Sequence, residues 1–280
     1  MKCACDNRDD AGQSRASTFF TSVRAIALAA AMLAWPHSGQ SAERTPDFSF
    51  SSKAVKITVR LDPRIKAEPG LAASCLSDGK QWAARSRADA EKMKKGSLLS
   101  FSGGRWTFDR TYTLGPVIGK RYVNVMQFDR IFVGGNHNSG GSSVTLWDRA
   151  TRKRTDIRPF LTETNDDGPT MKAIQSAVIA SLIEEKKRRG AYRAEDRFWE
   201  SYDYLKASLA KIGPTLLAPS TEQDKSSGLN FYYAAGAIST PSEPEYIAFV
   251  PWETLKPYLS PEGAKIFGGA RPKGDGDGRQ

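Results

Sequence analysis

The sequence predicts an α+β fold in which a largely antiparallel sheet has helices packed on one side. The first observation is the order of the periodic segments: strand-like segments come first, helical segments follow, and a last pair of strands closes the chain. The second observation is a tight turn at residues 148–151 between two strand-like segments, which is typical of an antiparallel hairpin. No internal repeat is present.

The predicted fold begins with a strand and a long helix. Apolar residues occupy every second position from Val55 to Leu61, which is the pattern of a half-buried strand, and Asp62-Pro63 closes it. Residues 64–95 are predicted to form a helix that stops at Gly96. The face of this helix that is expected to be buried carries Leu71, Cys75 and Trp82.

The central part of the chain is predicted to consist of strands. They span residues 106–114, 121–127, 129–133, 143–147 and 154–158. A Gly-rich loop separates the third strand from the fourth, and the turn at residues 148–151 separates the fourth from the fifth.

Two amphipathic helices and a closing pair of strands complete the predicted fold. The apolar stripes of the helices end at Gly190 and Gly213, because glycine favours the end of a helix. A polar loop is expected before the closing strands. In chain order these elements are helices 171–190 and 198–212, the loop 216–228, strands 229–235 and 246–250, and a short helix 251–259.

The chain is predicted to contain a signal peptide, one composite domain and a tail. An apolar run from Ala25 to Trp35 follows a basic residue and precedes small residues, so residues 1–42 are expected to be removed on export. Residues 43–269 then form a single domain, and residues 270–280 form a disordered tail. No stable membrane span is expected after cleavage of the signal peptide.

Composition favours a periplasmic or secreted protein with an anionic partner. The formal net charge is +10, and attraction to an anionic envelope surface or polymer explains this surplus better than nucleic acid does in an exported protein. Cys75 is the one cysteine outside the leader, so no internal disulfide is expected. Burial on the apolar face of a helix is the expected role of Cys75.

The most unusual stretch is the Gly-rich loop at residues 132–141. It contains His137, the one histidine outside the leader, between Asn136 and Asn138. Loops held by strands often carry binding and catalytic residues. The glycine spacing fits neither a P-loop nor a dinucleotide fingerprint, and a lone histidine supplies one ligand where zinc needs three or four. The sequence therefore predicts no cofactor and no metal.

Three stretches carry a resemblance to a known family. They are Ile57–Pro63 with Leu71 and Trp82, then Phe132–His137 with Leu146–Arg149, and last Phe231–Tyr233 with Val250–Trp252. Through these stretches the chain resembles the RsiV-like family, an exported bacterial domain of unknown function. The resemblance implies a PdaC-like half at about residues 50–115 and an RsiV-like half at about residues 120–269.

The resemblance implies a role outside the membrane, at the cell envelope. One type of family member is the extracellular part of an anti-sigma factor that binds lysozyme, and another accompanies a polysaccharide deacetylase at the cell wall. This chain shows no spanning helix, no sigma-binding segment and no deacetylase domain. Asn136 and Asn138 also stand where the family has Ala and Pro, and residues 240–245 replace an acidic, Gly-containing segment.

Seven residues form the predicted binding set, because aromatic faces with nearby amides and carboxylates suit a sugar ring or a protein partner. They are Asn136, His137, Asn138, Trp147, Asp148, Tyr232 and Tyr233. The alternative is a structural role: His137 bonds the backbone of its own loop, and the aromatic residues pack inward. Trp147 and Asp148 have opposite parity along a strand, so at most one of them is expected to point into the core.

The leading interpretation is an exported binding module of the cell envelope, with a lysozyme-like protein or peptidoglycan as its partner. No catalytic residue is assigned, since no complete catalytic constellation is present in the sequence. One alternative is an envelope glycan hydrolase or esterase that uses His137 and Asp148, which requires these side chains to converge with a nucleophile or metal. A second alternative is a structural envelope protein without an exposed aromatic patch.

Overall fold

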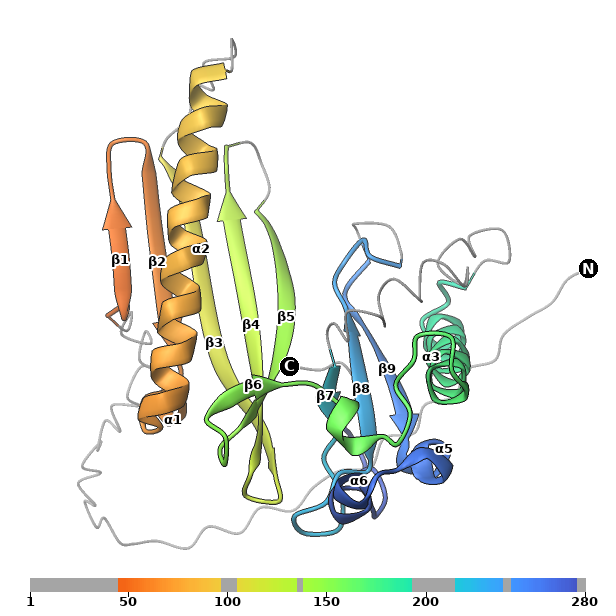
Figure 1. Ribbon diagram of the computed structural model, residues 1–280. Coiled ribbons are helices and arrows are strands. Elements are labelled where there is room, and N and C mark those ends of the chain that lie inside the picture. The colour runs from red at the N-terminus through yellow and green to blue at the C-terminus, as the bar shows by residue number, and fades with distance from the viewer. Residues whose placement is uncertain (1–44, 97–104, 135–137, 193–214, 239–242, 276–280) are drawn as a thin grey trace, which may run out of the picture. The chain divides into compact units, whose positions relative to one another are not determined.

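The structure is a computed structural model that describes residues 45–96, 105–134, 138–192, 215–238 and 243–275 (Figure 1). Residues Thr45–Gln280 cluster into one compact unit. The expected leader and the expected helix at residues 198–212 lie outside the described residues, as do Asn136 and His137. Among the described helices, none has both the length and the apolar content needed to cross a bilayer.

The larger sheet has six strands in the order in which they occur along the chain. The strands are β1 (Phe48–Ser51), β2 (Val55–Leu61), β3 (Trp106–Ile118), β4 (Tyr122–Phe132), β5 (Ser139–Asp148) and β6 (Lys153–Thr155). Neighbouring strands are antiparallel except for β2 and β3, which pair in parallel across a helical connection. The α+β class and the largely antiparallel sheet are therefore confirmed.

Helices α1 (Pro63–Lys66) and α2 (Pro69–Gly96) form the connection between β2 and β3. Asp62 begins α1, because its side chain accepts a hydrogen bond from the backbone of Arg64. Helix α2 packs against β2 and β3, so one face of the sheet is covered (Figure 1). The apolar core between them contains the predicted Leu71, Cys75 and Trp82.

A second, three-stranded sheet follows in the chain, with the order β7-β8-β9. Its strands are β7 (Thr215–Leu217), β8 (Gly228–Tyr233) and β9 (Tyr246–Pro251). Helix α3 (Pro169–Arg188) packs against β9 and α5 (Trp252–Leu255). The short helices η1 (Arg158–Phe160), η3 (Lys256–Tyr258) and α6 (Pro261–Ile266) complete this part. Its apolar core is centred on the buried side chains of Phe160, Ile174 and Phe231.

The second sheet is the main architectural difference from the prediction of a single sheet. Residues 215–217 were expected within a polar loop, yet they form β7, which is fully buried. Strand β4 is also continuous where two strands were predicted. The expected strand at residues 154–158 forms only as the short β6, after which the chain turns into η1.

Part of the expected Gly-rich loop is in fact strand. Ser139 begins β5, and Gly140 and Gly141 pair with Arg130 and Asp129 on β4. Gly140 is needed here, because a Cβ atom at this position would lie 2.2 Å from the carbonyl oxygen of Asp129. Gly140 thus permits close strand pairing at a position where the sequence predicted a loop.

The expected disordered tail is packed against the protein as far as Asp275. The backbone N–H of Thr221 donates a hydrogen bond to the carbonyl of Ala270. The backbone N–H of Ala270 donates to the hydroxyl of Thr221. The guanidinium of Arg271 lies over the ring of Phe249 and pairs with Asp275. The prediction of disorder was therefore wrong for residues 270–275, because these contacts are not visible in a Gly-Asp-rich composition.

Candidate functional site

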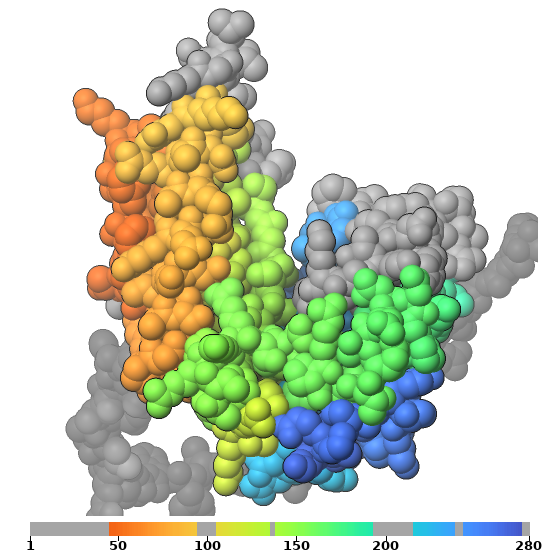
Figure 2. Space-filling view, in the orientation of Figure 1, coloured from red at the N-terminus to blue at the C-terminus, as the bar shows by residue number. Residues whose placement is uncertain are grey.

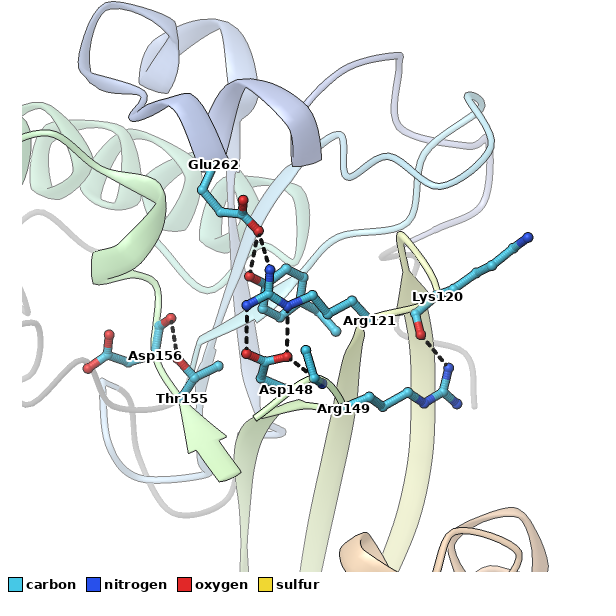
Figure 3. A network of polar contacts seen from close by, with 9 residues as sticks. Lys120, Arg121, Asp148, Arg149, Thr155, Asp156 and Glu262 are labelled. Atoms are coloured by element: carbon cyan, nitrogen blue, oxygen red, sulfur yellow. Dashed lines mark hydrogen bonds and ion pairs between the residues drawn. The ribbon is translucent and has the colours of Figure 1, made fainter. Parts of the chain in front are cut away.

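Asp148 lies at the end of β5 and is engaged by an arginine (Figure 3). Its two carboxylate oxygens accept hydrogen bonds from Nε and Nη2 of Arg121, each at 2.8 Å. One of these oxygens also accepts from the backbone of Ala150 at 2.9 Å. The hydrogen bonds from Arg121 hold the pKa of Asp148 below its usual range, so the carboxylate stays ionised at neutral pH.

Arg121 extends this network to α6 (Figure 3). Its Nη1 donates to Glu262 at 2.8 Å, and the hydroxyl of Tyr122 donates to the same carboxylate oxygen at 2.9 Å. The guanidinium also lies 4.8 Å from the centre of the Tyr122 ring. Because Asp148 closes a network that joins the larger sheet to a helix near the C-terminus, its contacts are those of a structural residue.

Asn138 lies at the opposite end of β5 from Asp148. It is exposed and directly precedes Ser139, the first residue of the strand. Ten residues in extended conformation span about 30 Å, so the described end of the Gly-rich loop is far from the Asp148 carboxylate. His137 lies outside the described residues. The described geometry therefore supplies no support for a pair formed by His137 and Asp148.

Trp147 and Asp148 are both buried, but only Trp147 lies in an apolar core, as the expectation that at most one of them points into the core requires. Their side chains do point to opposite faces of β5, as parity requires. Trp147 enters the core beneath α2, whereas Asp148 is covered on the other face by Arg121. Asp148 is buried as well because Arg121 covers the other face of the sheet at this end.

The two predicted tyrosines of β8 also point to opposite faces. Tyr233 is buried in the core against α3 and belongs to the structural set. Tyr232 is half-buried and points to the other face of the small sheet. Burial raises the pKa of Tyr232 to about 12, and the carboxylates of Asp275 and Glu245 act in the same direction. Tyr232 therefore remains a neutral hydrogen-bonding phenol.

Tyr232 lies on the face of the small sheet that points away from the core against α3, and a hydrogen bond links this part of the small sheet to the larger sheet. The hydroxyl of Ser142 on β5 donates to Glu245, just before β9, at 2.9 Å. Ser142 pairs with Phe128 on β4, so these two side chains share one face of the larger sheet. We call this surface the inter-sheet site, and it comprises Phe128, Ser142, Tyr232, Glu245, Phe249 and Arg271.

The inter-sheet site combines apolar rings with charged groups. Phe128 keeps 37% of its surface exposed, which is unusual for an aromatic residue in the middle of a long strand. The guanidinium carbon of Arg271 lies 4.4 Å from the centre of the Phe249 ring. Together the six residues supply three aromatic rings, two hydroxyls, one carboxylate and one guanidinium.

Asn230 adds a buried acceptor to the same face of β8. It lies two residues before Tyr232 and opposite Phe249 on β9. Its side chain is almost fully buried, and its Oδ1 has no hydrogen-bond partner among the described residues. A buried acceptor in this state costs about 1–3 kcal/mol until a donor reaches it.

Sequence reasoning found one member of this site and missed the others. Phe128 falls in the short gap between two predicted strands, so its exposure was not anticipated. Phe249 and Arg271 lie 22 residues apart and meet only through the fold. The available signal was parity: Phe128 shares its parity with the polar Arg130, which indicates an uncovered face.

Among the described residues, neither a metal cluster nor a reactive thiol is found. In the part of the chain that the structure describes, no three His, Cys, Asp or Glu side chains gather closely enough to hold a metal ion. Cys75 is buried beneath α2, and burial raises the pKa of its thiol to about 11. Such a thiol is unreactive at neutral pH.

Comparison with known proteins gave matches at the level of structure. No family model matches the chain, and no curated protein matches it. A DUF3298 family protein from Pseudomonas aeruginosa PAO1 is 14% identical and covers 78% of this chain and 90% of its own length, with a TM-score of 0.47. A member of the same family from Bacteroides fragilis NCTC 9343 is 13% identical and covers 76% and 92%, with a TM-score of 0.45. Both of these solved structures are described as DUF3298 family proteins.

Proposed function

We propose that the protein is an exported binding module of the cell envelope and that it recognises a glycan at the inter-sheet site. The observation that carries this proposal is the exposed ring of Phe128, whose directly paired neighbours on both adjacent strands are polar. On β3 it is flanked by Thr111 and on β5 by Ser142. An exposed aromatic ring between hydrogen-bonding side chains suits a ligand with one apolar and one polar face.

A sugar ring has this combination of faces. Its C–H face stacks on an aromatic ring, and its hydroxyls exchange hydrogen bonds with groups such as Ser142, Tyr232 and Glu245. The positive net charge of the chain adds attraction for the carboxylates of an anionic polymer. Peptidoglycan has both sugar rings and carboxylates, which makes it the favoured ligand.

The envelope location and the RsiV-like assignment rest on the sequence. The apolar run before residue 42 supports export, and the three quoted motifs support the family assignment. A lysozyme-like protein is the alternative partner of such a module. The enzyme alternative has less support, because Arg121 and Ala150 already occupy the Asp148 carboxylate.

The proposal is tested by sedimentation of the protein with purified peptidoglycan, alongside capture on immobilised lysozyme. Phe128→Ala should weaken peptidoglycan binding about tenfold, which corresponds to the loss of about 1.4 kcal/mol of stacking free energy. Val117→Ala is the matched control, because Val117 is equally exposed but lies at the end of β3. Val117→Ala should leave binding unchanged.

The other outcomes would reject parts of the proposal. Binding to lysozyme but not to peptidoglycan would replace the glycan with a protein partner. Equal binding by wild type and Phe128→Ala would remove the inter-sheet site from the function. Absence of binding to both targets would favour the structural alternative, and release of soluble sugar would favour the hydrolase.

A further inference from the structure

Strand β1 is an open edge of the larger sheet. Among the described residues it pairs only with β2, in an antiparallel register that places Phe50 opposite Ile57. The backbone of Ser52 donates to Val55 at 2.8 Å, which fixes the alternation of inward and outward groups. By this alternation, the backbone N–H and C=O groups of Ser49 and Ser51 point away from β2.

The opposite edge of the same sheet is protected, and β1 is not. Strand β6 is only three residues long, and Arg152, Lys153 and Arg154 place charges along it. Charges on an edge strand discourage pairing with another chain. Within β1 the sequence is Phe-Ser-Phe-Ser, which has no charge and no proline. This edge therefore has the properties of an interface.

A groove with an apolar floor runs beside the open edge, between β1 and α2, which lie next to each other (Figure 2). Its volume is about 360 Å³. The guanidinium of Arg87 lies 4.4 Å from the centre of the Phe50 ring within it. The groove is lined by Phe48, Phe50, Lys80, Ala83, Ala84, Arg87, Ala88 and Glu91.

We infer that a second copy of this chain occupies the edge and the groove, related by a two-fold axis through Phe50. This axis places Ser49 opposite the partner's Ser51, and both residues direct their backbone groups outward. Ladder hydrogen bonds then form at both of these pairs. The rings of Phe50 and the partner's Phe50 fall on the same face, where directly opposite residues approach most closely.

Lys80 and Glu91 are complementary under the same two-fold axis, and Glu91 also pairs with Arg87 of its own helix at 2.8 Å. Lys80 and Glu91 lie at opposite ends of the groove, about 16 Å apart along α2. The axis makes the two α2 helices antiparallel, so Lys80 lies near the partner's Glu91. Three strand spacings separate the helices by about 14 Å, a gap that phenylalanine rings and long charged side chains can fill.

The first test is the mass of the protein, expressed from its full-length gene, by sedimentation across a hundredfold range of concentration. The wild type should pass from monomer to dimer within this range. Ser49→Pro should remain monomeric, because proline removes an outward N–H that makes no bond to β2. Its thermal unfolding should match that of the wild type. A wild type that is monomeric at every concentration would overturn the inference.

Charge reversal tests the two-fold arrangement itself. Lys80→Glu and Glu91→Lys should each weaken the dimer at least tenfold, because each change brings two like charges together at both of the symmetry-related contacts. The double variant should restore wild-type association. Arg85→Glu is the matched control, because Arg85 is exposed on α2 outside the groove and its reversal should change nothing. A dimer that is insensitive to both single reversals and to Ser49→Pro uses another surface and refutes the inference.

Discussion

The carboxylate of Asp148 accepts hydrogen bonds through both oxygens where β5 ends, and its side chain is almost fully buried. A buried carboxylate needs such partners, because an ionised oxygen without them loses its hydration. Arg121 supplies them and is itself partly exposed. The residue that sequence reasoning offered as a catalytic candidate is therefore explained by the stability of the fold.

Asp148→Asn should lower the free energy of unfolding by about 2 kcal/mol, because a neutral amide cannot accept both charge-assisted bonds. Chemical denaturation at neutral pH measures this change. Glu184→Gln is the control, since Glu184 is exposed on α3 and such a surface change shifts stability by about 0.5 kcal/mol or less. Equal effects of the two substitutions would contradict the structural role of Asp148.

The contribution of Asp148 should also depend on pH. The pKa of Asp148 is lowered in the folded protein, so its stabilisation is present above its ordinary pKa and is lost as pH falls through the lower folded value. The difference in stability between wild type and Asp148→Asn should therefore be largest at neutral pH and shrink below about pH 4. A constant difference down to pH 2 would refute this assignment.

Cys75 should be unreactive in the folded protein. Burial raises the pKa of its thiol to about 11, so almost no thiolate exists at pH 8. Alkylation at Cys75, followed by peptide mass spectrometry, should be about a hundredfold slower than in urea-unfolded protein. Comparable rates in the two states would show that α2 opens freely over this residue.

Strands β4 and β5 form a long hairpin whose far end depends on glycine. Ser139 to Gly141 pair with Ile131 to Asp129, and a side chain at position 140 would meet the Asp129 carbonyl. Gly141 is different, because no atom lies within 4 Å of a Cβ placed there. Substituting each of these adjacent glycines therefore distinguishes the effect of close backbone packing from the effect of chain flexibility.

Gly140→Ala should destabilise the protein by about 2 kcal/mol, because the new methyl group forces β4 and β5 apart. Gly141→Ala should be neutral or stabilising by about 0.5 kcal/mol, since alanine restricts the unfolded chain. Thermal unfolding of both variants makes the comparison. If the two variants unfold alike, the hairpin does not close as tightly as described.

The elements that the sequence predicted well are those with a long, regular period. Strand β2 and helix α3 lie where alternation and the apolar stripe indicate. Strand β7 was missed because three buried residues are too short for a period, and β1 was missed because its phenylalanines are only half-buried. The inter-sheet site was mostly missed for a different reason: Phe128, Ser142 and Glu245 meet through pairing between distant strands.

Asn124 joins the two sheets through bonds that resemble those of a strand. Its side-chain nitrogen donates to the carbonyl of Leu217 at 2.8 Å, and its oxygen accepts from the Leu217 N–H at 3.1 Å. Both residues are buried. One side chain on β4 thus satisfies both backbone groups of a residue on β7, so the small sheet is held by polar contacts as well as by its apolar core.

Asn124→Leu should cost about 3 kcal/mol, because it leaves two buried backbone groups without partners. In the Asn124→Leu variant, the backbone amide hydrogens of β7 should exchange faster than those of β4. Asn138→Ala is the control, since Asn138 is exposed and its loss should have no effect on stability. Retained protection of β7 in Asn124→Leu would mean that packing alone holds the two sheets together.

The parallel pairing of β2 with β3 has a consequence for the order in which the chain is made. Thr58 and Asp109, which bond across these strands, are 51 residues apart, and Arg121 and Glu262 are 141 apart. At a synthesis rate of about 10 residues per second, about 5 seconds pass between the synthesis of Thr58 and that of Asp109. About 14 seconds pass between the synthesis of Arg121 and that of Glu262. A nascent chain therefore presents an extended apolar segment for several seconds, which is long enough for a chaperone to bind it.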